Sequence, residues 1–82
     1  MTRDELVTVI ADFLADELDV DASAISEDTR FREDLDADSL DLYTLVQELE
    51  DRYEVRMTDE EAAAITTVGQ AADFVHARLP AG

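Results

Sequence analysis

The sequence predicts an all-α protein: a four-helix bundle with a long loop between the first and second helices and a short third helix. Three observations lead to this fold class. Apolar residues recur at intervals of three and four along much of the chain. Residue pairs typical of helix N-termini precede each predicted helix. The alternating apolar pattern of a strand occurs only briefly, at positions 53–57, which we interpret as a connection.

The first helix is marked by an apolar stripe behind a predicted capping box formed by Thr2 and Glu5. The stripe has the spacing of one helical face and consists of Leu6, Ile10, Phe13, Leu14 and Leu18. Positions 19–38 lack this periodicity, so we expect a long loop pinned by its isolated apolar residues Ile25, Phe31 and Leu35. Because helix connections in bundles usually take about 2–8 residues, this segment is either a functional loop or contains a further short helix.

The second helix begins near Ser39, where Asp38 is the expected N-cap and Asp41 its partner in a partly box-like arrangement. Its apolar stripe consists of Leu42, Leu45, Val46, Leu49 and Tyr53. A short third helix is predicted from the box at positions 58–61 ahead of Ala62, Ala63, Ala64 and Ile65. Thr67 and Gln70 fit another capping box, and the fourth helix then runs to Pro80 with one face made of Val68, Ala71, Ala72, Val75 and Leu79.

Length and composition limit the organisation and the chemistry. A chain of 82 residues fits a single domain, 1–82, and its hydrophobic fraction of 46% is enough for a packed core. The absence of cysteine excludes disulfides, thiolate zinc sites and cysteine nucleophiles. No apolar run approaches the roughly 18 residues of a membrane span, and the first residues lack a basic signal-peptide head, so we expect a cytoplasmic protein.

The charge is strongly acidic. Six arginines stand against 22 aspartates and glutamates, which gives a formal net charge of −16. This balance disfavours nucleic acid and anionic membranes as partners and favours proteins with basic patches. Copies of the chain would repel one another, so we expect a monomer. Acidity alone could equally serve solubility, because it specifies no function.

One hydroxyl stands out at the end of the long loop. In the segment Asp-Leu-Asp-Ala-Asp-Ser-Leu-Asp at 34–41, Ser39 falls in the first turn of the second helix, where free N–H groups and the helix dipole favour an anion such as a phosphodiester. We expect Leu40 to anchor this turn in the core and leave Ser39 outward. No adjacent base in this chain would activate the hydroxyl, so a separate transferase would attach the group. The simpler interpretation is an ordinary serine at a helix start.

The same segment resembles the signature of the acyl carrier proteins of the discrete bacterial type, in which the serine of Asp-Ser-Leu receives 4′-phosphopantetheine from coenzyme A. The likeness covers roughly positions 31–76. It also includes Phe31, Leu45-Val46, Leu49-Glu50, Tyr53, Val55, Met57 and the sequence Ile-Thr-Thr-Val-Gly at 65–69. The resemblance implies the four-helix fold and a non-enzymatic carrier whose arm on Ser39 ends in a thiol that holds acyl groups as thioesters.

The resemblance also implies roles for neighbouring residues. Asp38 would help to present Ser39 to a phosphopantetheinyl transferase, and Leu40 would dock on that enzyme. Acids of the second helix would meet basic patches on enzymes that load or accept the acyl group, and by position these are Asp41, Glu48, Glu50 and Asp51. A solvated helix face is the alternative for the last three. The apolar faces of helices two and four would shelter the acyl chain, although core packing alone also explains them.

Four positions depart from the family pattern. Asp36 replaces a usual glycine, so a side chain is present in the turn before the helix. Thr44, Gln47 and Arg56 replace a usual glutamate, methionine and acid. These changes would suit a carrier for a polyketide or lipopeptide pathway in place of the standard fatty acid partners, but the pathway stays open.

Other functions fit the residues less well. Asp34, Asp36 and Asp38 alternate as in a calcium loop, but Ser39 and Leu45 occupy the places of its essential glycine and glutamate, so we predict no metal site. A serine enzyme would need His76, which has no third partner or oxyanion loop, so we predict no catalytic residue. A peptidyl carrier and an acidic interaction module remain as alternatives.

Overall fold

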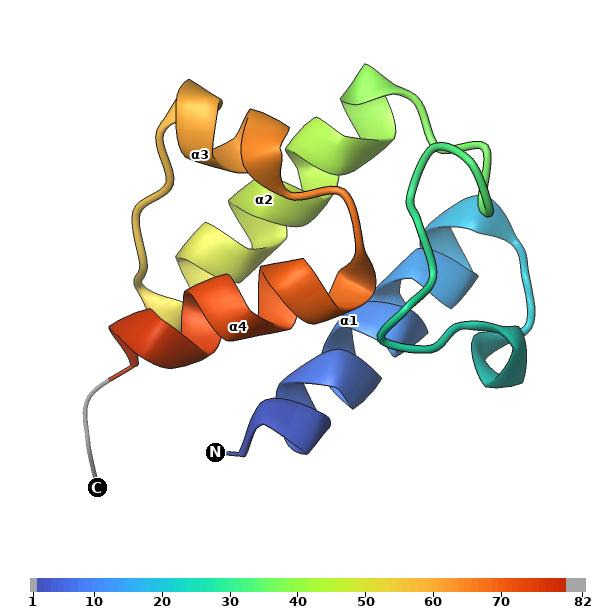
Figure 1. Ribbon diagram of the computed structural model, residues 1–82, viewed down its shortest axis with the longest axis horizontal. Coiled ribbons are helices and arrows are strands. Elements are labelled where there is room, and N and C mark those ends of the chain that lie inside the picture. The colour runs from blue at the N-terminus through green and yellow to red at the C-terminus, as the bar shows by residue number, and fades with distance from the viewer. Residues whose placement is uncertain (1, 80–82) are drawn as a thin grey trace.

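The computed structural model describes residues 2–79, and over this range the chain is helical with no strand (Figure 1). The all-α prediction with four helices is confirmed. In chain order the elements are α1 (Arg3–Leu18), the 3₁₀-helix η1 (Ala22–Ala24), α2 (Ser39–Tyr53), α3 (Asp59–Ala64) and α4 (Val68–Arg78).

Each of the four α-helices begins with a complete capping box. The side chain of the N-cap residue accepts the backbone N–H of the residue three positions later, and the side chain of that later residue accepts the backbone N–H of the N-cap residue. All four boxes fall at the predicted positions: Thr2 with Glu5, Asp38 with Asp41, Thr58 with Glu61 and Thr67 with Gln70. The helix starts are therefore set by local sequence. At the other end, α4 stops at Arg78 with Leu79 as its C-cap, and the predicted stop signal Pro80 lies outside the described residues.

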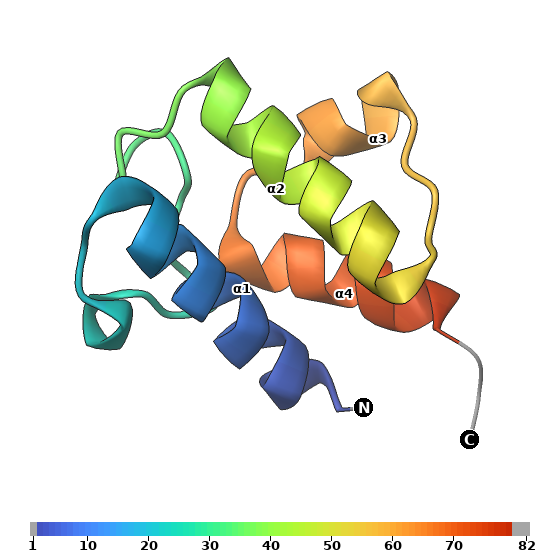
Figure 2. The ribbon, with the colours of Figure 1, turned by 180° about the vertical axis from the view of Figure 1, so that it is seen from behind.

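The core lies between α1, α2 and α4. The buried apolar residues are contributed by all three helices and by the loop, and they include Leu6, Ile10, Leu14, Phe31, Leu45, Leu49, Val68, Ala71, Ala72 and Val75. In contrast, α3 has no fully buried residue and lies alongside the N-terminal half of α2 (Figures 1 and 2). This short helix covers one side of α2 without belonging to the core.

The long loop between α1 and α2 is present, and it contains the short helix η1 that its length had suggested. Its predicted anchors are Ile25 and Phe31, which are buried, and Leu35, which is half-buried. Backbone bonds tie the loop to the start of α4, from the Phe31 N–H to the Thr66 carbonyl at 3.0 Å and from the Val68 N–H to the Thr29 carbonyl at 3.1 Å. These bonds hold the loop against the start of α4.

The turn before α2 keeps the backbone geometry of a glycine without having one. Asp36 has a φ of 54°, in the left-handed region that glycine adopts freely and aspartate tolerates better than most residues. A side chain at this angle costs about 1–2 kcal/mol. Asp36 therefore adopts a backbone conformation that glycine would adopt without this cost.

Candidate functional site

Ser39 is the first residue of α2, and its side chain is exposed. The Asp38 carboxylate accepts the Asp41 N–H at 3.0 Å, and the Asp41 carboxylate accepts the Asp38 N–H at 3.2 Å. The N–H groups of Ser39 and Leu40 donate to no group among the described residues. Because α2 is 15 residues long, these free donors and the helix dipole favour a negative group on Ser39.

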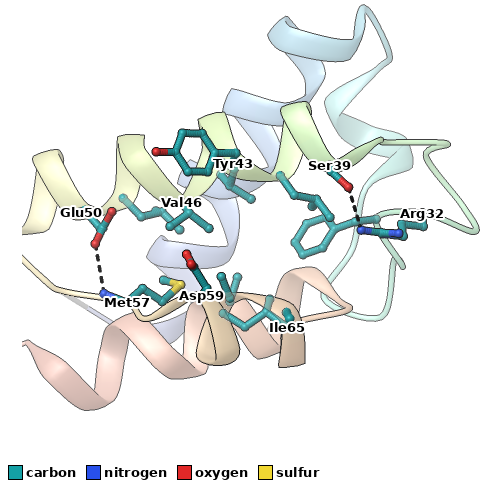
Figure 3. Close-up of a pocket in the computed structure, with 15 residues that line it drawn as sticks. Arg32, Ser39, Tyr43, Val46, Glu50, Met57, Asp59 and Ile65 are labelled. Carbon is teal, nitrogen blue, oxygen red and sulfur yellow. Dashed lines mark hydrogen bonds between the residues drawn. The ribbon is translucent and has the colours of Figure 1, made fainter.

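Arg32 lies beside this hydroxyl, and the sequence analysis did not identify it. Its Nη2 donates a hydrogen bond to the Ser39 Oγ at 3.2 Å (Figure 3). The signal was available in the sequence, since Arg32 is one of only six cations and stands seven residues before Ser39. What could not be read from the sequence is that the loop folds back and places the two side chains together.

A cavity of about 430 Å³ opens between α2 and α3, within the range of roughly 300–1,000 Å³ typical of small-ligand sites. Ser39 and Arg32 lie at one end, and Glu50 and Met57 lie at the other (Figure 3). Most of the lining is apolar and includes Phe31, Leu42, Leu45, Val46, Leu49, Ala62, Ala63 and Ile65. The apolar faces of helices two and four were expected to form this shelter, but α4 contributes Ala71, and α3 forms the wall that faces α2.

The prediction that Leu40 anchors the turn in the core was wrong. Leu40 is 75% exposed, and the buried anchor of this turn is Ala37, whose N–H donates to the Phe31 carbonyl at 2.9 Å. The reason is the start of the helix at Ser39, which turns Leu40 to the outer face of α2 and Leu42 toward the core. Together with Tyr43, also exposed, Leu40 forms an apolar surface next to Ser39.

The four acids predicted to meet partners have different surroundings. Asp41 is half-buried in the capping box, and Glu48 forms an ion pair with Arg52 at 3.0 Å. Glu50 accepts the Met57 backbone N–H at 3.0 Å and so closes the far end of the cavity. The fourth acid, Asp51, is exposed. Their roles toward partners stay predictions, and Glu50 has in addition a structural contact that the sequence analysis did not foresee.

The residues weighed for other chemistries are not assembled into a site within the described range. His76 is exposed in the last turn of α4, which lies beside the C-terminal end of α2, whereas Ser39 begins that helix (Figures 1 and 2). Within residues 2–79, no three metal-ligating side chains come close enough to hold an ion. Asp34 instead accepts the Arg30 backbone N–H at 2.9 Å, a contact that lowers the pKa of its carboxyl. No helix in this range is long and apolar enough to cross a membrane.

Comparisons with known proteins agree with this geometry. The profile of the phosphopantetheine attachment site family matches residues 8–75. An acyl carrier protein of Rubrobacter xylanophilus is 48% identical over 75 residues, covering 92% of this chain and 93% of the relative. Another, of Lactobacillus acidophilus, is 41% identical over 75 residues, covering 92% and 94%.

A solved structure of the acyl carrier protein from Enterococcus faecalis superimposes with a TM-score of 0.80 at 34% identity, covering 94% of this chain and 98% of that one. The family match implies a covalently attached 4′-phosphopantetheine, and an exposed hydroxyl with a guanidinium and free helix N–H groups around it fits the phosphate of such an arm. Sequence, fold and site thus converge, and this chain belongs to the acyl carrier proteins.

Proposed function

We propose that this chain carries acyl groups as thioesters on a 4′-phosphopantetheine arm attached to Ser39, and that it has no catalytic activity of its own. The observation that carries the proposal is the position of the Ser39 hydroxyl, exposed at the start of α2 and at the mouth of the apolar cavity. An arm on this oxygen could reach both solvent, where partner enzymes bind, and the cavity, where an acyl chain would be shielded from water.

Attachment depends on a second protein. Arg32, the residue that contacts the Ser39 Oγ, is not a base, because a guanidinium stays protonated at neutral pH. A phosphopantetheinyl transferase would therefore accept the hydroxyl proton while the Ser39 oxygen bonds to the coenzyme A phosphorus next to the pantetheine. The pyrophosphate bond breaks in the same step, and adenosine 3′,5′-bisphosphate leaves. The exposed Leu40 and the carboxylate of Asp38 are the groups that we assign to docking of that enzyme.

The cavity supports a long apolar cargo. Its α2 and α3 walls are mainly aliphatic, with the charged groups Glu50 and Asp59 among the lining residues. Each methylene that enters such a site gains about 0.8 kcal/mol from its removal from water. An alkyl chain therefore gains more here than the charged amine of an aminoacyl group, and this difference favours an acyl carrier over a peptidyl carrier.

We assign delivery to enzymes with basic patches in fatty acid, polyketide or lipopeptide biosynthesis. The exposed Thr44 and Gln47 on α2 alter the surface near Ser39 relative to the usual family pattern, which supports a specialised pathway. Asp41, Glu48, Glu50 and Asp51 are the proposed partner contacts. A single carrier domain, 1–82, a monomeric state and a cytoplasmic location complete the proposal.

Mass spectrometry tests the central claim. The chain is incubated with coenzyme A and a broad phosphopantetheinyl transferase, next to the variants Ser39→Ala and Ser23→Ala. We expect one arm on the wild type and on Ser23→Ala, which removes an exposed hydroxyl in η1, and none on Ser39→Ala. An unmodified wild type under conditions that load a control carrier would contradict the proposal and favour an acidic interaction module.

A further inference from the structure

Arg32 differs from most arginines of this chain in having no carboxylate partner among the described residues. Four of the six arginines form ion pairs with described acids, namely Arg3, Arg30, Arg52 and Arg78. In a protein with 22 acidic residues, an arginine side chain is rarely far from a carboxylate. Arg32 nevertheless directs its guanidinium to the neutral Ser39 hydroxyl, which leaves its positive charge uncompensated by any ion pair within residues 2–79.

The surroundings of Ser39 explain why a cation is useful there. Two carboxylates lie close to Ser39 along the chain, that of Asp38 directly before it and that of Asp41 two residues after it, and both are already engaged in the capping box. A phosphodiester on Ser39 would add a further negative charge between these carboxylates. The free N–H groups of the first turn offset part of this repulsion, and the Arg32 guanidinium is placed to offset more of it.

The backbone around Arg32 holds its side chain at this position. The preceding residue, Phe31, is buried, its N–H donates to the Thr66 carbonyl at 3.0 Å, and its carbonyl accepts the Ala37 N–H at 2.9 Å. The loop backbone is thus fixed on both sides of Arg32, so only its side chain has to be ordered when it binds an anion. Its planar fork of donors matches the two unbridged oxygens that a phosphodiester presents.

We propose that Arg32 binds the phosphate of the arm and is a positioning residue for it. This inference rests on the proposed attachment at Ser39. The Nη2 that contacts Oγ before modification would bind the unbridged phosphate oxygens afterwards, and this contact holds the base of the arm at the end of the cavity shared by Ser39 and Arg32. The arm then extends along the α2–α3 cavity toward Glu50 and Met57 (Figure 3).

The first measurement compares the arginine Nε–Hε signals of the unmodified and modified wild type by NMR, after mass spectrometry has shown complete conversion. On modification we expect the Arg32 signal to shift and its exchange with water to slow, and we expect high salt to reverse both effects because the contact is exposed. Arg56, exposed and also without an ion pair to a described acid, provides an internal reference that should not change.

The second measurement compares the thermal midpoints of the unmodified and modified forms in Arg32→Gln and in the matched control Arg56→Gln, which removes the same charge elsewhere. Attachment of the arm shifts the thermal midpoint, and we expect this shift to be about 2–4 °C less favourable in Arg32→Gln than in the wild type. This is the difference expected for one lost surface ion pair in a chain of this size. In Arg56→Gln, the shift of the thermal midpoint caused by the arm should equal that of the wild type.

Each outcome decides the inference. If the modified wild type shows the unmodified Arg32 signal and the two variants respond alike to the arm, Arg32 does not bind the phosphate. A slower loading of Arg32→Gln combined with unchanged Arg32 signals would overturn the inference too, and would assign Arg32 to the transferase contact. A wild type that takes no arm at all is a separate result, since it refutes the attachment at Ser39.

Discussion

Ala62 lies on α3 in the wall of the cavity and is half-buried, so a larger side chain there would occupy space that we assign to the acyl chain. The change Ala62→Leu adds three carbon atoms to a side chain that already faces the α2 wall. Because the cavity of about 430 Å³ is mainly apolar, the added carbons are removed from water without displacing a polar group.

The magnitude follows from the area that each carbon buries. Three added carbons at about 0.8 kcal/mol each stabilise the protein without an acyl chain by up to about 2 kcal/mol. The same carbons exclude a similar number of methylenes of the bound chain, so the stabilisation that acylation adds falls by about 2 kcal/mol. Ala62→Leu is thus expected to be more stable than the wild type before acylation, and acylation is expected to raise its stability by less than it raises that of the wild type.

Urea unfolding of the modified protein, with and without an octanoyl group on the arm, measures both quantities. The control is Ala64→Leu, which makes the same change on the same helix at an exposed position outside this cavity. If acylation stabilises Ala62→Leu as much as Ala64→Leu and wild type, the acyl chain does not occupy the α2–α3 cavity. That result would refute the assignment of the cavity while leaving the attachment at Ser39 untouched.

Three further predictions concern the fold. Gly69→Ala should destabilise the protein by about 1–2 kcal/mol in urea unfolding, because a Cβ there would lie 2.9 Å from the Glu27 carbonyl oxygen. This steric cost exceeds the gain in helix propensity. An unchanged unfolding midpoint would contradict this packing. Tyr53→Phe should stabilise it by about 1 kcal/mol, because the buried Tyr53 hydroxyl has no partner in the described chain, whereas Tyr43→Phe at an exposed site should change nothing. Glu61 accepts the backbone N–H of Thr58, the α3 cap, which lowers the pKa of its carboxyl from the ordinary value of 4.5. This contact therefore stabilises the fold fully above the unfolded pKa, and its contribution is lost as the pH falls through the lower folded pKa. Thermal scans should therefore show a smaller loss of stability on acidification for Glu61→Gln than for wild type. Parallel profiles of thermal midpoint against pH would contradict the stabilising role of this contact.

Local sequence predicted the helices well because their signals are local. A capping box joins residues three positions apart, and an apolar stripe repeats within two turns, so neither depends on distant parts of the chain. The four helices, their starts and the loop with its anchors Ile25 and Phe31 were readable on this basis. Ser39 was identified in the same way, from its place in the first turn and from a contiguous motif.

The failures concern contacts between distant residues. Leu40 is apolar and lies within the motif, yet in the first turn of α2 it points outward, and Ala37 takes the buried position. The sequence pattern of α4 suggested a wall of the acyl site, but α4 packs mainly against α1 and contributes Ala71 to the cavity, and α3 faces α2 instead. An apolar stripe shows that a face is covered without showing which element covers it.

The sequence by itself determined the helical class, the helix starts, the acidity and the serine that we propose as the attachment point, because each depends on neighbouring residues or on totals. Only the tertiary structure decided that Arg32 contacts Ser39, that Glu50 accepts the Met57 N–H, and that α2 and α3 enclose a cavity between these two contacts. The physical reason is that such contacts depend on how backbone bonds of Phe31 join the loop to Thr66 after α3 and to Ala37 before α2, and no local pattern specifies these bonds.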